Sequence, residues 1–242
     1  MPEHASANSV RSSADPSLQA VFWDMDGTIV DTEPYWIAAE KDLALSFGVE
    51  WTEAQAEAMV GQALEFGAGM LRKAGVDLPV RTIVDRLINR VADQVRQDVP
   101  WRPGARELLA GLKEAGIPCG MVTMSEPVLA KVIVESLPAG TFDLVVTGDM
   151  VDAGKPHPEA YLQAFETLAR TVPDLRPDRV VAIEDSLPGT ASARAAGLVT
   201  LGIPNFVPLP PGTVEHEWDT LAGRGVRDLI SLLPATVPEP AR

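Results

Sequence analysis

The sequence has little of what several classes of protein require. It has one cysteine, Cys119, and its three histidines, His4, His157 and His216, lie far apart. A single cysteine excludes an internal disulfide framework, and without a Cys/His cluster the usual donors of a zinc site are missing. No stretch approaches the roughly 20 apolar residues of a membrane-spanning helix. Residues 1–18 contain no apolar signal-peptide centre, so we expect a disordered leader on a cytoplasmic protein.

Basic residues are scarce relative to acidic ones. The 242-residue chain has 20 Lys and Arg against 34 Asp and Glu, which gives a formal net charge of -14. This charge repels nucleic-acid phosphates, and the basic residues are scattered along the chain, so DNA and RNA are not expected partners. A small anionic ligand is still compatible with this charge, because local cations and backbone N–H groups bind such a ligand.

Apolar residues are plentiful, and their pattern predicts the fold. The composition, 46% hydrophobic and 22% charged, is that of a folded globular protein. Short apolar runs typical of strands occur at residues 20–23, 117–122, 144–146, 180–183 and 198–203. Helical patterns lie between most of them, at residues 104–115, 127–136, 158–170 and 188–196. This alternation predicts an α/β fold with a doubly wound parallel sheet and helices on both faces.

One interval interrupts the alternation. From Thr32 to about Pro100 the pattern predicts only helices, most clearly over Val80–Val95, where apolar residues recur on one face. Thr52 followed by Gln55 suits a capping box at a helix start. We therefore predict four parts: a leader over 1–18, an α/β core over 19–31 and 101–234, an inserted helical cap over 32–100, and a loose tail over 235–242.

Ligands of open parallel sheets bind beyond the carboxyl ends of the strands, and the first polar residues there are Asp24 and Asp26 in DMDGT. Two carboxylates two residues apart can point the same way. One could attack phosphorus while the other serves as general acid and base, and Gly27 would permit the tight turn. An isolated DMDG is equally typical of an ordinary turn.

Two further strand ends carry residues that suit a phosphoryl group. The hydroxyl of Thr123 and the N–H of Met124 could hold a phosphoryl oxygen, although Thr123 could instead cap the helix that begins near Glu126. Lys155, in GKPHP, could offset the repulsion between a carboxylate and a phosphate dianion. That repulsion is on the order of 4 kcal/mol per charge pair at about 4 Å and an effective dielectric near 20. A solvated loop lysine is the alternative.

Consecutive acids, Glu184 and Asp185, follow the apolar segment VVAI. Such acids are costly after a buried strand unless they are paired or bound to metal. Asp24, Asp185 and the backbone carbonyl of Asp26 could supply protein ligands to Mg²⁺. Alternatively, Asp185 or Ser186 could cap the next helix. The joint occurrence of all four sets at strand ends favours phosphoryl chemistry.

The segments FWDMDGTIVDTEP, MVTMS, GKPHPEAY and VVAIEDSLPGTASARAAG resemble the four motifs of the haloacid dehalogenase-like hydrolase superfamily, in its branch with a helical cap on a Rossmann-like core. The resemblance covers about residues 20–203. It implies Asp24 as nucleophile, Asp26 as acid/base, Thr123 and Lys155 as phosphate clamps, and Asp185 as a magnesium ligand assisted by Glu184. True dehalogenases lack the second Asp, so Asp26 indicates phosphoryl chemistry.

The most similar branch contains β-phosphoglucomutase and phosphatases of sugar phosphates, phosphoglycolate and nucleotides. Such mutases carry a His where this chain has Trp36, and an Arg shortly after a cap glycine that corresponds to Gly61, where it has Leu64. These departures favour hydrolysis. Glu33, Trp36 and Gln62 are the cap candidates for substrate contact, although Glu33 could equally serve the helix dipole.

The sequence therefore predicts a Mg²⁺-dependent phosphatase that hydrolyses a small phosphomonoester through an aspartyl-phosphate. We expect a phosphorylated metabolite as its partner, no contact with nucleic acid or membrane, and a monomer or weak homodimer. A phosphosugar mutase is the main alternative. A signalling protein read through its phospho-Asp is another, but the long helical insertion and Asp26 count against it.

Overall fold

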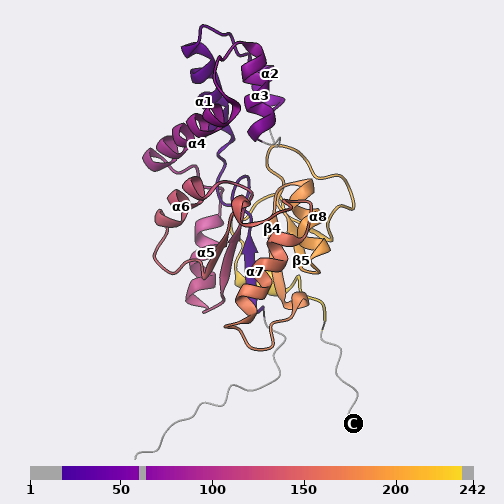
Figure 1. The fold of residues 1–242 in the computed structure, drawn as a ribbon. Coiled ribbons are helices and arrows are strands. Elements are labelled where there is room, and N and C mark those ends of the chain that lie inside the picture. Colours follow the sequence, from indigo (N-terminus) through magenta and orange to yellow (C-terminus); the bar gives the residue numbers. More distant parts are fainter. Residues whose placement is uncertain (1–17, 60–63, 236–242) are drawn as a thin grey trace, which may run out of the picture.

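The computed structural model describes residues 18–59 and 64–235 (Figure 1). Apart from Leu18 and Ala235, the predicted leader and tail lie outside the described residues, as do Gly61 and Gln62.

A parallel sheet forms the centre of the fold. Its six described strands follow the order β3-β2-β1-β4-β5-β6, and every neighbouring pair is parallel. They are β1 (Ala20–Trp23), β2 (Cys119–Val122), β3 (Leu144–Val146), β4 (Val180–Glu184), β5 (Val199–Gly202) and β6 (His216–Glu217). The five predicted strands are confirmed, with ends that differ by one or two residues. The sixth, β6, has no apolar run and exists through its pairing with β5.

Alternate residues of β1 supply two separate cores. Ala20 and Phe22 belong to one buried cluster, and Val21 and Trp23 to the other, because successive side chains of a strand point to opposite faces. The first face is covered by α7 (Glu159–Ala169) and α8 (Leu187–Ala195). The second is covered by α5 (Ala105–Glu114), α6 (Pro127–Glu135) and α9 (Val226–Ile230). The short 3₁₀ helices η1 (Gly148–Met150) and η2 (Pro177–Arg179) lie in the connections. The predicted doubly wound, Rossmann-like sheet is confirmed.

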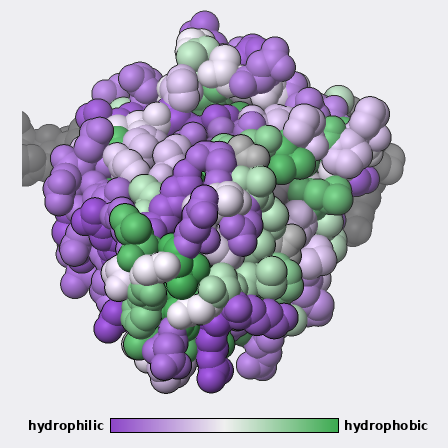
Figure 2. Space-filling view, turned by 90° about the horizontal axis from the view of Figure 1, so that it is seen from above, coloured by the Kyte–Doolittle hydropathy of each residue, from purple (hydrophilic) through white to green (hydrophobic). Residues whose placement is uncertain are grey.

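In the described residues, four helices lie between β1 and α5 in the sequence and form a separate group beyond the carboxyl ends of the strands (Figure 1). They are α1 (Glu33–Ser46), α2 (Glu53–Glu57), α3 (Leu64–Ala74) and α4 (Val80–Gln97). We call this group the cap and propose 32–100 as its bounds. Seen from the cap end, the surface is mostly hydrophilic, with smaller hydrophobic areas (Figure 2). In the described part of the chain, no helix combines the length and apolar character needed to cross a membrane.

Local patterns in the cap behave as the sequence predicts. The apolar face of α4 is buried from Ile83 to Val95, whereas Val80 at its first position is half-buried. The capping box of α2 forms: the N–H of Gln55 donates to Thr52 Oγ1 at 3.3 Å, and the N–H of Thr52 donates to Gln55 Oε1 at 3.0 Å.

The chain leaves and re-enters the core at one place. The N–H of Asp31 donates to the carbonyl of Pro100 at 2.8 Å, and the N–H of Arg102 donates to the carbonyl of Ile29 at 2.9 Å. The two linkers of the cap therefore run side by side, in an antiparallel pairing.

Two glycines with positive φ, one before and one after α5, provide a matched test of packing. Gly104 (φ 86°) precedes α5, and a Cβ there would overlap the backbone carbonyl of Leu221. Gly116 (φ 67°) has nothing within 4 Å of such a Cβ. We expect Gly116→Ala to cost about 1–2 kcal/mol through its left-handed backbone alone. Gly104→Ala should cost at least about 1 kcal/mol more, since overpacking adds to the strain. Urea unfolding measures both, and equal losses would contradict the overlap.

Candidate active site

Three neighbouring strands end at the same edge of the sheet. Asp24 follows β1, Thr123 follows β2, and Glu184 and Asp185 end and follow β4. Because β1 lies between β2 and β4, the residues that follow these strands are neighbours in space. Lys155 reaches the same place from the loop before α7, so the predicted strand-end residues meet at one site.

The ammonium group of Lys155 holds this site together. Its Nζ donates to Asp24 Oδ1 at 2.6 Å, to Glu184 Oε1 at 2.6 Å and to the carbonyl of Val122 at 2.8 Å. Nζ also lies 5.2 Å from the ring centre of Tyr161, within the range of a cation–π contact. Burial disfavours the charged form, but Asp24 and Glu184 outweigh it and hold the pKa of Lys155 above its ordinary value. The lysine is therefore a fixed buried cation, and the alternative of a solvated loop residue is wrong.

The Glu184 side chain is fully buried, and among the described residues only one of its two carboxylate oxygens has hydrogen-bond partners. Its Oε1 accepts hydrogen bonds from Lys155 and from the hydroxyl of Tyr161, each at 2.6 Å. Its Oε2 is buried and has no hydrogen-bond partner within the described residues. A Cβ at Gly189 would overlap this oxygen, so α8 approaches the carboxylate as closely as it does only because residue 189 is glycine.

The position of the Asp185 carboxylate depends on another glycine. Gly27 has a φ of 85°, and a Cβ there would overlap the carboxylate of Asp185. The turn after β1 and the acid after β4 can therefore meet. Ser186 caps α8, since its Oγ accepts from the N–H of Gly189 at 3.2 Å. Of the two candidate caps for this helix, the structure has Ser186, which leaves the Asp185 carboxylate at the site.

The acidic groups fit a hard divalent cation. One ligand atom from each of Asp24, Glu184 and Asp185 lies within 4.8 Å of the others. Burial, followed by the charges of Asp24 and Glu184, raises the pKa of Asp185 to about 9. Burial is also the main cause that raises the pKa of Glu184 to about 7. Lys155 alone therefore does not neutralise these carboxylates. Oxygen donors and excess negative charge are what Mg²⁺ requires, and the unpartnered Oε2 of Glu184 is a further available donor.

Asp26 stands apart from that cluster. Its Oδ1 accepts a hydrogen bond from Thr32 Oγ1 and its Oδ2 accepts one from Ser125 Oγ, both at 2.6 Å. Burial raises the pKa of Asp26, while the two hydroxyls act in the opposite direction. Sequence reasoning missed both hydroxyls as partners of Asp26. Each lies in a motif that was recognised, but a Ser or Thr near a helix start is usually a cap.

Thr123 and Met124 follow β2, which neighbours β1 in the sheet. The buried Thr123 Oγ1 accepts from the N–H of Ser125 at 3.0 Å, so it closes the turn after β2. The N-cap of α6 is Glu126, without a side-chain cap bond, so Thr123 does not cap this helix. Met124 Sδ accepts from the N–H of Lys155 at 3.4 Å. Phosphate binding by Thr123 and Met124 stays a prediction.

Two of the cap candidates, Glu33 and Trp36, lie on the first turn of α1 in different surroundings. Glu33 starts α1 directly after Thr32 and is half-buried. Burial, followed by the charges of Asp26, Glu40 and Asp31, raises the pKa of Glu33 to about 7. Trp36, later in the same turn, is partly buried against the large apolar cluster.

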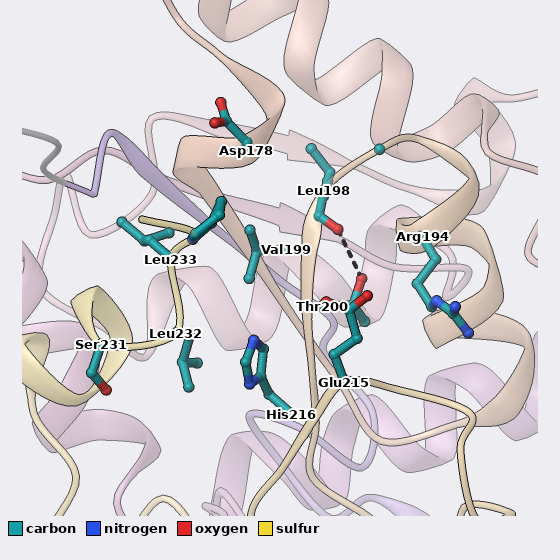
Figure 3. A pocket seen from close by; sticks show the side chains of 12 residues that line it. Asp178, Arg194, Leu198, Val199, Thr200, Glu215, His216, Ser231, Leu232 and Leu233 are labelled. Atoms are coloured by element: carbon teal, nitrogen blue, oxygen red, sulfur yellow. Dashed lines mark hydrogen bonds between the residues drawn. The ribbon is translucent and has the colours of Figure 1, made fainter. Parts of the chain in front are cut away.

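A surface cleft of about 660 Å³ lies elsewhere, where β5 and β6 begin (Figure 3). Its lining includes Val199 and Thr200 of β5, His216 of β6, and Leu232 and Leu233 after α9. None of the predicted site residues that the structure describes lines it. The geometry described above therefore locates the candidate chemistry at the opposite, carboxyl edge of the sheet.

Comparison with known proteins agrees with this geometry. The haloacid dehalogenase-like hydrolase family matches residues 18–197. The chain belongs to this family. A phosphorylated carbohydrates phosphatase of Thermotoga maritima is 31% identical over 75% of this chain and 82% of its own length. Hexitol phosphatase B of Escherichia coli K12 is 30% identical over 77% of this chain and 84% of its own length.

Solved structures of haloacid dehalogenase-like proteins share the fold. CbbY from Rhodobacter sphaeroides, solved in complex with phosphate, has a TM-score of 0.76 and 26% identity, covering 88% of this chain and 99% of its own. The family and its phosphatase relatives confirm the prediction of a phosphatase of this family. Enzymes of the family generally use Mg²⁺, and this chain has the acidic cluster described above.

The raised carboxyl pKa values predict how stability depends on pH in EDTA. The folded-state pKa of Asp185 is about 9 against an ordinary 3.8, and that of Glu184 is about 7 against 4.5. Between about pH 4 and 9 the folded state therefore binds more protons than the unfolded state, and the free energy of unfolding falls as pH rises. Asp185→Asn should flatten this slope and be more stable than the wild type at pH 8. Mg²⁺ should reverse that order, because only the wild type keeps the carboxylate.

Urea unfolding from pH 5 to 9, in EDTA and in Mg²⁺, measures these differences. Asp219→Asn, at an exposed position, is the matched control and should keep the wild-type slope. An unchanged slope in Asp185→Asn would show that this carboxyl group does not titrate as described.

Proposed function

We propose that the chain is a Mg²⁺-dependent phosphatase that hydrolyses a small phosphomonoester through an aspartyl-phosphate on Asp24. One observation carries the proposal: Asp24 and Asp26, two residues apart, have separate partners. Asp24 contacts the buried cation Lys155 and lies with Asp185 and Glu184, whereas Asp26 is held by two neutral hydroxyls. This division suits a nucleophile that must stay charged and an acid that must exchange a proton.

The nucleophile is Asp24, whose residue is 7% exposed. Lys155 binds its Oδ1 and leaves the second carboxylate oxygen to attack phosphorus. The bond from phosphorus to the leaving oxygen breaks as the new bond to Asp24 forms. The charge of Lys155 offsets the repulsion between the carboxylate and the phosphoryl group, and Lys155, Thr123 and Met124 bind the phosphoryl oxygens.

The acid and base is Asp26. Burial raises its pKa, so it can hold the proton that it gives to the leaving alkoxide. As a carboxylate it then accepts a proton from the water that attacks the aspartyl-phosphate. Its hydrogen bonds from Thr32 and Ser125 stabilise this charged form and fix its orientation.

The residues proposed to hold Mg²⁺ are Asp24, Asp185 and Glu184, together with the backbone carbonyl of Asp26. The ion, when bound, supplies positive charge that offsets the charge of the phosphoryl group. The protein's contribution is to keep these oxygen donors together in a buried, partly desolvated place.

The proposed substrate is a small phosphorylated metabolite. The names of two relatives refer to phosphorylated carbohydrates and hexitols, and a CbbY structure contains a xylulose bisphosphate. The cap lies over the carboxyl edge of the sheet, and we propose that it closes over bound substrate and excludes water. Glu33, Trp36 and Gln62 are the proposed cap contacts to the substrate.

Replacement of the two aspartates tests the assignment. Asp24→Asn should abolish phosphate release, because an amide cannot form the aspartyl-phosphate. Asp26→Asn should lower kcat about 10² to 10⁴-fold through loss of acid/base catalysis. Phosphate release is measured on a panel of phosphomonoesters with and without Mg²⁺, with Asp219→Asn as control. Full turnover by Asp24→Asn would refute the nucleophile, and isomerised sugar phosphate with little free phosphate would indicate a mutase.

Removal of one hydroxyl tests the role of Asp26 separately. Ser125→Ala removes a hydrogen bond that lowers the pKa of Asp26, so the limbs of the pH–rate profile that belong to Asp26 should move to higher pH. Ser125→Thr keeps a hydroxyl and should stay nearer to the wild-type profile. A lower kcat without any shift in the profile would mean that Ser125 has only a structural role.

A further inference from the structure

One amide side chain joins the two linkers of the cap. Asn205 lies in the loop between β5 and β6, which rises beyond the carboxyl ends of the strands toward the cap (Figure 1). Its Nδ2 donates to Asp31 Oδ1 at 3.1 Å, and its Oδ1 accepts from the guanidinium of Arg102. Asp31 belongs to the linker that leaves the core, and Arg102 to the linker that returns. Asp31 and Asn205 are 174 residues apart in the sequence, so this bridge is a product of the tertiary fold.

The bridge uses both halves of the amide. Arg102 also donates to the carbonyl of Pro204 at 3.2 Å, so the guanidinium holds two successive residues of this loop. Asp31, Arg102 and Asn205 are all half-buried, which makes their hydrogen bonds stronger than those of exposed side chains. An amide offers a donor and an acceptor, whereas a carboxylate only accepts. An aspartate at position 205 could therefore keep the bond from Arg102 but not the bond to Asp31.

Asp31 is fixed at both its backbone and its side chain. Its N–H donates to the carbonyl of Pro100 at 2.8 Å, and its carboxylate accepts from Asn205. The next residue, Thr32, is buried and donates to Asp26 Oδ1 at 2.6 Å. The peptide unit between positions 31 and 32 is planar and rigid, so a displacement of Asp31 moves Thr32 with it. The anchor at Asp31 therefore sets the place from which the Thr32 hydroxyl reaches Asp26.

We propose that Asn205 is a positioning residue that keeps Asp26 in place to protonate the leaving oxygen. It acts through Asp31 and Thr32, and the inference rests on the proposed phosphatase function. In this step the bond between phosphorus and the leaving oxygen breaks, the oxygen keeps the electron pair, and the proton on Asp26 passes to it. Misplacement of a reacting group by about 1 Å can cost about 10²-fold in rate, so a small shift of the linker has a measurable effect.

Two substrates that differ in their need for a proton test this role. The first is the alkyl phosphate that the phosphomonoester panel shows to be turned over fastest, and its alkoxide must be protonated as it leaves. The second is 4-nitrophenyl phosphate, whose phenolate is stable and leaves without a proton. The values of kcat/KM, measured with Mg²⁺, therefore report transfer to Asp24 with and without the proton from Asp26.

An isosteric variant breaks one bond of the bridge. Asn205→Asp keeps an acceptor for Arg102 and replaces the donor to Asp31 by a like charge. It should lower kcat/KM about ten- to a hundredfold for the alkyl phosphate and less than about threefold for 4-nitrophenyl phosphate. Thr32→Val, which removes the hydroxyl at nearly equal shape, should show the same selective loss. Asn89→Asp makes the same chemical change at an exposed position of α4 and should leave both values unchanged.

An exchange of the two side chains provides a conservative rescue. In the double variant with Asp31→Asn and Asn205→Asp, the amide lies on the linker and the carboxylate on the loop. Donor and acceptor are swapped, so a hydrogen bond between positions 31 and 205 returns, and Arg102 still has its acceptor. The ratio of kcat/KM for the alkyl phosphate to that for 4-nitrophenyl phosphate should rise at least about fivefold above that of Asn205→Asp alone.

The outcomes separate this inference from the proposed function. Phosphate release from neither compound, nor from the wider panel, would overturn the phosphatase assignment itself. Equal losses on both compounds in Asn205→Asp would overturn positioning while that assignment stands, because a general structural defect does not distinguish leaving groups. A selective loss that Thr32→Val does not share, or no gain in the exchanged pair, would overturn the route through the linker. If Asn205→Asp does not fold, Asn205→Ala, which adds no charge, replaces it with the same expected loss.

Discussion

The site depends on one buried ammonium group. Lys155 joins the end of β1 through Asp24, the end of β2 through the carbonyl of Val122, and the end of β4 through Glu184. Carboxylates so close together repel one another, and without a fixed cation the repulsion between the ends of β1 and β4 would be unopposed. Burial first, and then the charges of neighbouring carboxylates, raise the pKa values of Glu184 and Asp185, so one cation offsets only part of the cost of this cluster. A protein can keep such a cluster only where the surrounding sheet is well packed, and the residues of β1, β2 and β4 are all buried.

Parts of the fold were predictable because local patterns decided them. β1 and β4 are continuous apolar runs, and α4 has a regular apolar face, so composition and periodicity locate them. β6 was missed because its two residues, His216 and Glu217, carry no strand pattern and only their pairing with β5 makes them a strand. The short helix α9 was missed in the same way, since five residues are too few to display a helical period.

The candidate site shows the same difference between what local sequence patterns predict and what tertiary packing decides. Asp24, Lys155, Glu184 and Asp185 were predictable because each stands at or near a strand end with an acidic or basic side chain. Their partners were not. Ser125 is 99 residues from Asp26, and Tyr161 lies on α7 as an ordinary core aromatic until its hydroxyl reaches Glu184. Sequence shows which groups can react, whereas the packing of distant segments decides which hydroxyl holds which carboxylate and so how acidic each carboxylate is.

The paired linkers of the cap have a consequence for how such proteins diversify. Because Asp31 and Pro100 are hydrogen-bonded neighbours, everything between them could be exchanged for another insertion without moving the ends of the core. Such an exchange would also affect the chemistry of the site. Thr32, the first residue beyond that junction, donates a hydrogen bond to the proposed acid/base residue, so a transplanted cap without a hydroxyl at this position would change the acidity of Asp26. Recombination at this junction would then alter substrate choice through the new cap and proton transfer through residue 32.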